Sequence, residues 1–101
     1  SLPVWLAPVQ VEVIPVTDDC PQYAGAVCAE LKARGVRTEV DESPATVGYK
    51  IRSAEVRKVP YMAIVGKREV EQQKVSVRKH GTGNVGSMTT DELATHMRKL
   101  K

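Results

Sequence analysis

Two side chains of opposite charge, Glu69 and Arg78, are the pair best suited to ligand recognition in this 101-residue sequence. Arg78 alternates with Val75 and Val77, which predicts a strand from which the arginine points outward. Glu69 precedes it in residues 67–70, which we expect to form a short neighbouring strand. A guanidinium fork complements O6 and N7 of guanine, and a carboxylate can accept from N1–H and N2–H of the same base. The pair could therefore hold an unstacked guanine of single-stranded RNA. The alternative is a surface ion pair worth at most about 1 kcal/mol.

The charge distribution also favours a polyanionic partner. Residues 1–49 carry three basic and seven acidic side chains, whereas residues 50–80 carry nine basic and three acidic ones. A basic block of this kind attracts nucleic acid. The alternative is a solvated charged surface without a specific partner.

No arrangement of residues predicts catalysis. Ser43 and Ser53 have no histidine nearby in sequence, and we expect His80 and His96 to be solvated. Residues 81–86 match the spacing of a dinucleotide-binding glycine motif, but only 15 residues follow them. That motif joins a first strand to its helix and needs a further strand with an acidic residue about 20 positions further on. We therefore expect a flexible glycine loop there, and no independent enzyme.

The two cysteines indicate a reduced compartment. Cys20 and Cys28 lie eight residues apart in a predicted helix, which separates them by about 12 Å, and a disulfide tolerates about 7 Å between Cα atoms. Cys28 is expected to be a core residue, and no metal site is predicted because zinc needs more ligands than these. No apolar run reaches the roughly 20 residues of a membrane span, so no membrane association is expected.

Strands and helices alternate along the chain. Alternating valines predict strands at residues 9–13 and 36–40, and the apolar run Tyr61–Val65 predicts a buried strand. Helices are predicted between these strands: one ending at Gly35, one starting at Ser43-Pro44, and a last one after the capping box at residues 89–92. With the two strands that carry Glu69 and Arg78, this order predicts one α/β domain over residues 1–101, with a mostly parallel sheet covered on both faces. The abrupt start at a predicted strand agrees with a piece of a longer protein.

Four short motifs carry a resemblance to a known family. They are Trp5-Leu6-Ala7-Pro8, Gly48-Tyr49-Lys50-Ile51-Arg52, Val59-Pro60-Tyr61-Met62 and Gly86-Ser87-Met88. In this order and spacing they resemble the C-terminal anticodon-binding domain of threonyl-tRNA synthetases, from a group shared with the prolyl, histidyl and glycyl enzymes. The resemblance covers nearly the whole chain. It implies a three-layer α/β/α domain with a five-stranded mixed sheet and three helices.

The resemblance also implies a function and a set of contacts. Such a domain reads the second and third anticodon bases, G and U, of the threonine tRNA, and the family's contact positions fall on Glu69, Arg78 and Pro44. The family usually has an asparagine at the third position, so Pro44 departs from the pattern and weakens the expectation that the U is read. Two explanations stay open: the backbone or a neighbour such as Ser43 or Thr46 takes over the contact, or the protein accepts a different or broader anticodon. The basic face of the second helix, with Lys50, Arg52 and Lys58 as candidates, is expected to meet phosphates.

The same resemblance assigns the chemistry to another part of the protein. ATP, threonine and zinc would belong to a catalytic domain absent from this chain, in a homodimeric cytoplasmic or organellar enzyme, while the domain alone could be monomeric. Two other readings stay open. One is a stand-alone interaction module, like the accessory subunit of a mitochondrial DNA polymerase, which binds protein or nucleic acid without anticodon preference. The other is a small-ligand domain of the same architecture.

Overall fold

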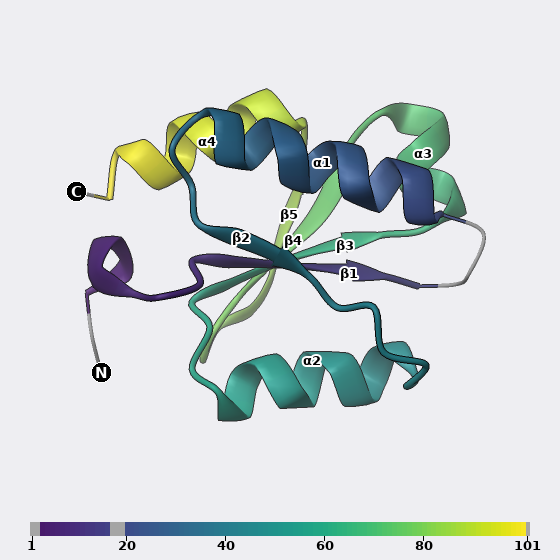
Figure 1. Cartoon of the computed structure of the whole chain (residues 1–101), viewed down its shortest axis with the longest axis horizontal. Coiled ribbons are helices and arrows are strands. Elements are labelled where there is room, and N and C mark those ends of the chain that lie inside the picture. The colour runs from purple at the N-terminus through teal and green to yellow at the C-terminus, as the bar shows by residue number, and fades with distance from the viewer. Residues whose placement is uncertain (1–2, 17–19, 101) are drawn as a thin grey trace.

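The computed structural model describes residues 3–16 and 20–100 and shows one mixed sheet with helices on both faces (Figure 1). A short 3-10 helix, η1 (Val4–Leu6), precedes the sheet. The strands are β1 (Val11–Pro15), β2 (Thr38–Val40), β3 (Tyr61–Val65), β4 (Val75–Lys79) and β5 (Gly83–Met88). The helices are α1 (Pro21–Ala33), α2 (Val47–Val56), α3 (Lys67–Gln72) and α4 (Thr90–Arg98).

The sheet has the strand order β2-β1-β3-β4-β5. Strand β1 pairs in parallel with both β2 and β3, because α1 and α2 return the chain to the same end of the sheet each time. Strand β4 is antiparallel to β3, and β5 is antiparallel to β4, so the chain finishes its sheet with a hairpin. The mixed sheet that the family resemblance implies is confirmed, but only two of the four strand pairings are parallel, so the sheet is not mostly parallel as the alternation of strands and helices had predicted.

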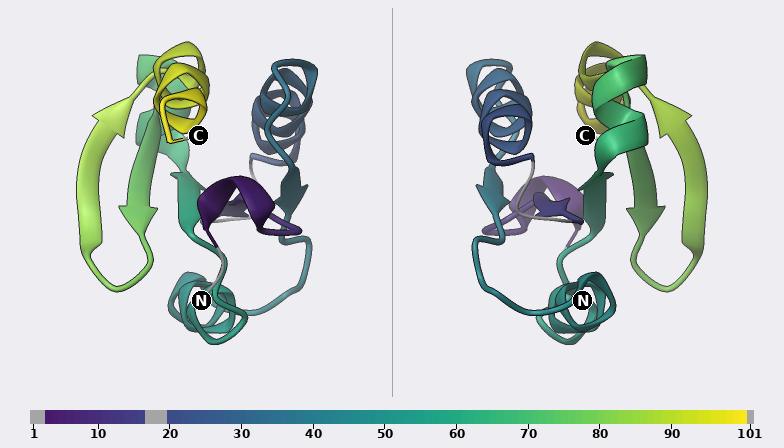
Figure 2. Two further views of the ribbon diagram at one scale, coloured as in Figure 1. Left: turned by 90° about the vertical axis from the view of Figure 1, so that its left-hand side faces the viewer. Right: turned by 90° about the vertical axis from the view of Figure 1, so that its right-hand side faces the viewer.

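Two apolar clusters hold the layers together. The larger lies between the sheet and α1 with α4, and the smaller joins Ile14 and Met62 to Ala54 of α2 on the opposite face. Figure 2 shows the resulting layers, with α1, α3 and α4 on one side of the sheet and α2 on the other. The three-layer α/β/α architecture and the five-stranded mixed sheet are therefore confirmed.

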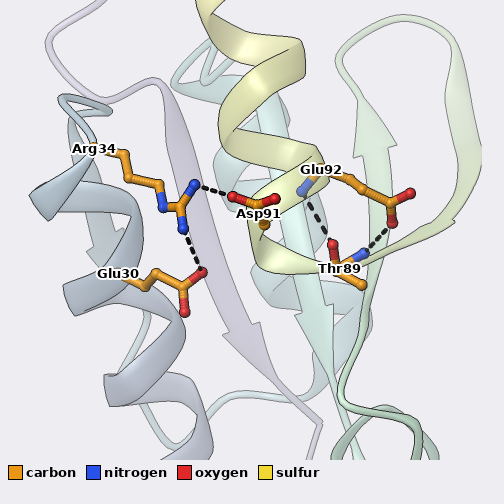
Figure 3. Close-up of polar contacts among 5 residues, drawn as sticks. All are labelled: Glu30, Arg34, Thr89, Asp91 and Glu92. Carbon is orange, nitrogen blue, oxygen red and sulfur yellow. Dashed lines mark hydrogen bonds and ion pairs between the residues drawn. The ribbon is translucent and has the colours of Figure 1, made fainter.

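Helix α4, which packs on the same face of the sheet as α1, is stabilised by hydrogen bonds in its first turn. Thr89 Oγ1 accepts from Glu92 N at 3.0 Å, and Glu92 Oε1 accepts from Thr89 N at 2.8 Å, which completes the predicted capping box of α4 (Figure 3). Asp91 in the same turn forms an ion pair with Arg34, which Glu30 also approaches at 3.9 Å. Both helices are thereby linked at their ends as well as through the core.

The second helix starts later than the sequence predicts. Pro44 was expected at its first position, but it lies in the loop before α2, and Thr46 is the N-cap, with its side chain accepting from Tyr49 N at 3.2 Å. Ser43 does not cap the helix either, because Asp41 Oδ1 accepts from the Ser43 backbone N–H at 2.9 Å. An Asx turn therefore takes the place of the expected first turn.

Two expectations near the end of the sheet were wrong. Residues 67–70, expected as a strand, belong to the short helix α3, so the described chain has four α-helices rather than three. The expected glycine loop is largely strand β5, which starts at Gly83. The register between β4 and β5 shifts there, because Val77 pairs with Gly86 whereas Arg78 pairs with Asn84, leaving Val85 as the extra residue of a bulge.

Candidate nucleic-acid interface

One face of the β4–β5 hairpin carries polar side chains and lies beside α2 rather than under it. Strand pairing aligns Arg78 with Met62 and Ser76 with Ile64, whose side chains pack in the α2 cluster. Arg78 and Ser76 therefore point to the α2 side of the sheet, as do their β5 partners Asn84 and Ser87. Helix α2 packs below β1 and β3, and the hairpin curves away to one side of it (Figure 2). We call this surface, formed by Ser76, Arg78, Asn84 and Ser87, the open face.

Arg78 lies half-buried on the open face. Its Nε is buried and has no hydrogen-bond partner among residues 3–16 and 20–100, and no ion pair to it is found in those ranges. A Cβ built on Gly83 would lie 3.8 Å from a terminal nitrogen of Arg78, so the guanidinium lies along the glycine backbone of β5. The side chain is thus supported by the hairpin without being neutralised by it.

Glu69 reaches the open face from the helix α3, not from a strand as predicted. Its Oε1 accepts from Gly66 N at 2.8 Å, which closes the first turn of α3. Its Oε2 accepts from Ser76 Oγ at 2.8 Å. Ser76 and Arg78 are two residues apart on β4, about 7 Å. The structure therefore brings Glu69 near Arg78 through Ser76, and no Glu69–Arg78 ion pair occurs in the described part of the chain.

Pro44 is exposed in the loop of residues 41–46, before the first turn of α2. Proline has neither a side-chain donor nor an acceptor, and its nitrogen carries no hydrogen. The neighbouring hydroxyl of Thr46 is used as the α2 cap. The position of the family's third contact thus offers no polar side chain of its own here.

Lys50 does not lie on an exposed basic face. Its side chain is 6% exposed, and its Nζ donates to the carbonyl oxygens of Pro15 and Asp41, both at 3.4 Å. Partial burial alone would raise the pKa of Asp41, but hydrogen bonds from Ser43 and the charges of Lys50 and Arg57 outweigh it and lower that pKa. Lys50 therefore ties α2 to the ends of β1 and β2, and its expected exposure to phosphates is corrected.

Arg52 and Lys58 are exposed, as a phosphate contact requires. Arg52 lies three residues before Glu55 and shares its flank of α2. Glu55 faces the hairpin, since His80 Nε2 lies 3.5 Å from Glu55 Oε2 and 3.1 Å from the Glu55 carbonyl oxygen. Arg52 therefore borders the open face. Lys58 follows the C-terminus of α2 with a positive φ of 60°.

Both histidines have partners that the sequence did not predict. His80, besides contacting Glu55, joins the hairpin turn to Pro60, whose carbonyl oxygen accepts from His80 N at 2.8 Å. His96 is half-buried, and its Nε2 lies 3.2 Å from Tyr61 Oη. Separations of 25 and 35 residues kept both contacts out of reach of local sequence patterns.

Other parts of the described chain offer little that competes with the open face. A hollow of about 650 Å³ lies beside β2 at the opposite edge of the sheet, and its lining mixes Lys32 and Lys50 with Glu39, Asp41 and Glu42. Residues 3–16 and 20–100 contain no group of three metal-ligating side chains.

Within the same ranges no helix is both long and apolar enough to cross a membrane. Cys20 and Cys28 are free and buried, and burial raises the pKa of the Cys28 thiol.

The chain resembles known proteins along nearly its whole length. A threonine–tRNA ligase from Chloroherpeton thalassium is 48% identical over 92 residues, which cover 91% of this chain and 14% of the ligase. The corresponding ligase from Prosthecochloris aestuarii is 44% identical over 99 residues, 98% of this chain and 15% of the ligase. The chain thus spans about one seventh of the length of the curated relatives it matches.

Solved structures share the fold. The RNA binding domain of threonyl-tRNA synthetase from Cryptosporidium parvum Iowa II superposes with a TM-score of 0.92 at 32% identity, over 98% of this chain and 25% of that one. Prolyl-tRNA synthetase from Cryptosporidium parvum gives a TM-score of 0.84 at 31% identity, over 97% of this chain and 21% of that one. A family model described as "Anticodon binding domain" matches residues 10–100. The chain therefore belongs to the anticodon binding domain family and is similar to the versions found in threonine–tRNA ligases.

Proposed function

We propose that this domain binds the anticodon loop of a threonine tRNA and reads the guanine at its second anticodon position through Arg78 and Glu69. The observation that carries the proposal is the Arg78 guanidinium on the open face, which has no ion-pair partner among residues 3–16 and 20–100, with the Glu69 carboxylate anchored beside the same strand. An arginine fork donates to O6 and N7 of guanine, and the carboxylate accepts from the N1–H and N2–H groups. Both edges of one splayed base would be engaged.

The phosphates of the loop would meet the exposed cations that border this face. Arg52 lies on the flank of α2 next to the hairpin, and Lys58 follows the end of that helix. Such contacts add affinity and salt dependence without selecting a base. Lys50 is left out of this role because its ammonium already contacts two carbonyl oxygens.

Discrimination at the third anticodon base is proposed to be weak. Pro44 offers no side-chain hydrogen bond. The Thr46 oxygen accepts from Tyr49 N as the α2 cap, so its hydroxyl hydrogen and the Ser43 hydroxyl are the side-chain groups left beside Pro44. Backbone groups of the loop at residues 41–46 remain to contact a uracil. A tRNA with another third base would therefore lose less affinity than one with another second base.

The parent protein is proposed to be an ATP-dependent threonine–tRNA ligase. In that enzyme this domain would help to position the tRNA. The match covers only 14% and 15% of these two relatives, which leaves room for a catalytic part. ATP, threonine and zinc are proposed to bind in that catalytic part. A homodimeric enzyme of the cytoplasm or an organellar matrix fits this proposal.

Titration with anticodon stem-loops tests the function. The domain is titrated at low salt with a threonine-tRNA anticodon stem-loop and with copies changed singly at the second or third base. We expect loss of the second-position guanine to weaken binding at least tenfold, corresponding to one bidentate base contact, and a third-base change to matter less. Arg78→Ala should remove the preference for guanine. Equal binding of all loops by the unaltered domain would instead indicate phosphate contacts alone, as in an interaction module.

A further inference from the structure

We infer that Ser76 is a positioning residue that sets the preference for guanine over adenine by holding the Glu69 carboxylate in place. This inference rests on the proposed function of Arg78 and Glu69. It goes beyond that function because Ser76 itself need not touch the base. The contact that carries it is the 2.8 Å hydrogen bond from Ser76 Oγ to Glu69 Oε2.

The helix that carries Glu69 does not by itself direct the carboxylate to the open face. Glu69 is the third residue of α3, and its Oε1 accepts from Gly66 N within the same turn. That bond anchors one oxygen while the carboxylate can still rotate about it. The bond from Ser76 is the second restraint, and it comes from the strand that carries Arg78.

With both restraints the carboxylate keeps acceptor capacity for a base. A carboxylate has about four lone-pair sites. Gly66 N and Ser76 Oγ occupy one site on each oxygen. One site per oxygen therefore remains, which matches the two adjacent donors, N1–H and N2–H, of guanine. Adenine presents an acceptor at N1 and no amino group at C2, so a fixed carboxylate disfavours it.

Ser76 also fixes the spacing between the two charged groups. Ser76 and Arg78 point to the same face two residues apart, about 7 Å along β4. A carboxylate held at Ser76 and a guanidinium held at Arg78 are therefore kept apart, and both stay available to one base. Loss of the serine hydroxyl would let the carboxylate turn toward Arg78 and neutralise it.

The test compares binding of two stem-loops, one with guanine and one with adenine at the second anticodon position. For Ser76→Ala we expect the guanine-to-adenine affinity ratio to fall about tenfold, the effect of one lost hydrogen bond to a charged group. Ser76→Thr keeps the hydroxyl on a strand residue and should restore the ratio. Ser87→Ala is the matched control, because Ser87 lies opposite Ser76 on the open face but makes no hydrogen bond to Glu69 in the described chain.

The outcomes separate this inference from the proposed function. If Ser76→Ala leaves the ratio unchanged while Arg78→Ala abolishes it, the positioning role is wrong and the anticodon function stands. If Ser76→Ala and Ser87→Ala lower the ratio equally, the effect is a general disturbance of the open face, which also overturns the role. If the unaltered domain binds both loops equally, the proposed function itself fails. Thermal unfolding of each variant confirms that it is folded at the assay temperature.

Discussion

Glu12 is buried at the centre of the sheet beneath α2, and its Oε2 lies 3.5 Å from Nη2 of Arg57 at the C-terminus of that helix. Only 3% of the Glu12 residue is exposed, and its Oε1 has no partner in the described chain. A buried carboxylate needs a compensating charge. Arg57 therefore anchors the end of α2 that also contacts the hairpin.

Replacing Arg57 should destabilise the domain. We expect Arg57→Ala to lower the free energy of unfolding by about 1–2 kcal/mol, because it leaves a buried charge without its partner, discounted for the exposure of the arginine. Urea unfolding measures the loss. Arg52→Ala, on an exposed part of the same helix, is the control and should change stability little. Equal losses in the two variants would show that the Glu12 contact contributes nothing.

The stability of the domain should carry a pH signature of Glu12. Burial raises the pKa of Glu12 above its ordinary value of 4.5, although Arg57 partly opposes this. The folded state then binds the proton more tightly than the unfolded state, so the contribution of Glu12 is fully present below pH 4.5 and is lost as the pH rises through the folded-state pKa. Glu12→Gln should remove this trend, so that its stability relative to the parent increases with pH. The comparison is made by urea unfolding between pH 4 and 7, with exposed Glu71→Gln as the control.

The capping box of α4 should be worth a measurable part of the stability. Thr89→Ala removes the acceptor for Glu92 N and is expected to cost about 1 kcal/mol. Thr89→Ser keeps the acceptor and should cost less. The denaturant midpoints of the parent, Thr89→Ala and Thr89→Ser proteins measure these stability differences.

The hydrogen bonds from Thr89 lower the pKa of Glu92, so their contribution to stability should be lost as the pH falls through the folded-state pKa of Glu92.

Two basic residues of α2 should respond differently in RNA binding and in stability. Arg52→Ala should weaken all stem-loops alike and reduce the slope of log affinity against log salt by about 0.7, the value for one phosphate contact in a single strand. Lys50→Ala should instead lower stability and leave that slope unchanged, because its ammonium faces two carbonyl oxygens. A selective loss for one anticodon in Arg52→Ala would contradict its assignment to a phosphate.

The sequence predicted those elements whose pattern is local and long enough. The strand Tyr61–Val65 is a continuous apolar run, and α1 shows a clear stripe of buried residues that ends before Gly35, where φ is 86°. Helix α3 was missed because six residues contain too few turns for a helical period to appear. Gly66 was interpreted only as the residue that ends the strand before it, although it is also the N-cap of α3.

The sequence nominated the charged residues of the candidate site but not the contacts that hold them. Glu69 and Arg78 were proposed from their charge, spacing and family resemblance, and their role in binding stays a prediction. The hydrogen bond from Ser76 to Glu69 could not be read from the sequence, because it joins a helix to a strand and depends on the turn between them. The burial of Lys50 was missed because its charge argued for exposure, although its position three residues after Val47 and four before Ala54 falls within the apolar stripe of α2. The carbonyl oxygens of Pro15 and Asp41 that accept from its ammonium lie far away in sequence.

The bulge between β4 and β5 has a consequence for how the domain behaves in solution. Strand β5 is an outer strand of the sheet, six residues long, and one edge of its backbone has no partner strand among residues 3–16 and 20–100. Such an edge can recruit a strand from another molecule and begin aggregation. The extra residue Val85 and the positive φ of 117° at Gly86 break the regular spacing of that edge and increase its twist. The β-bulge that places Asn84 opposite Arg78 therefore also disfavours edge-to-edge pairing of β5 with the same strand of another molecule.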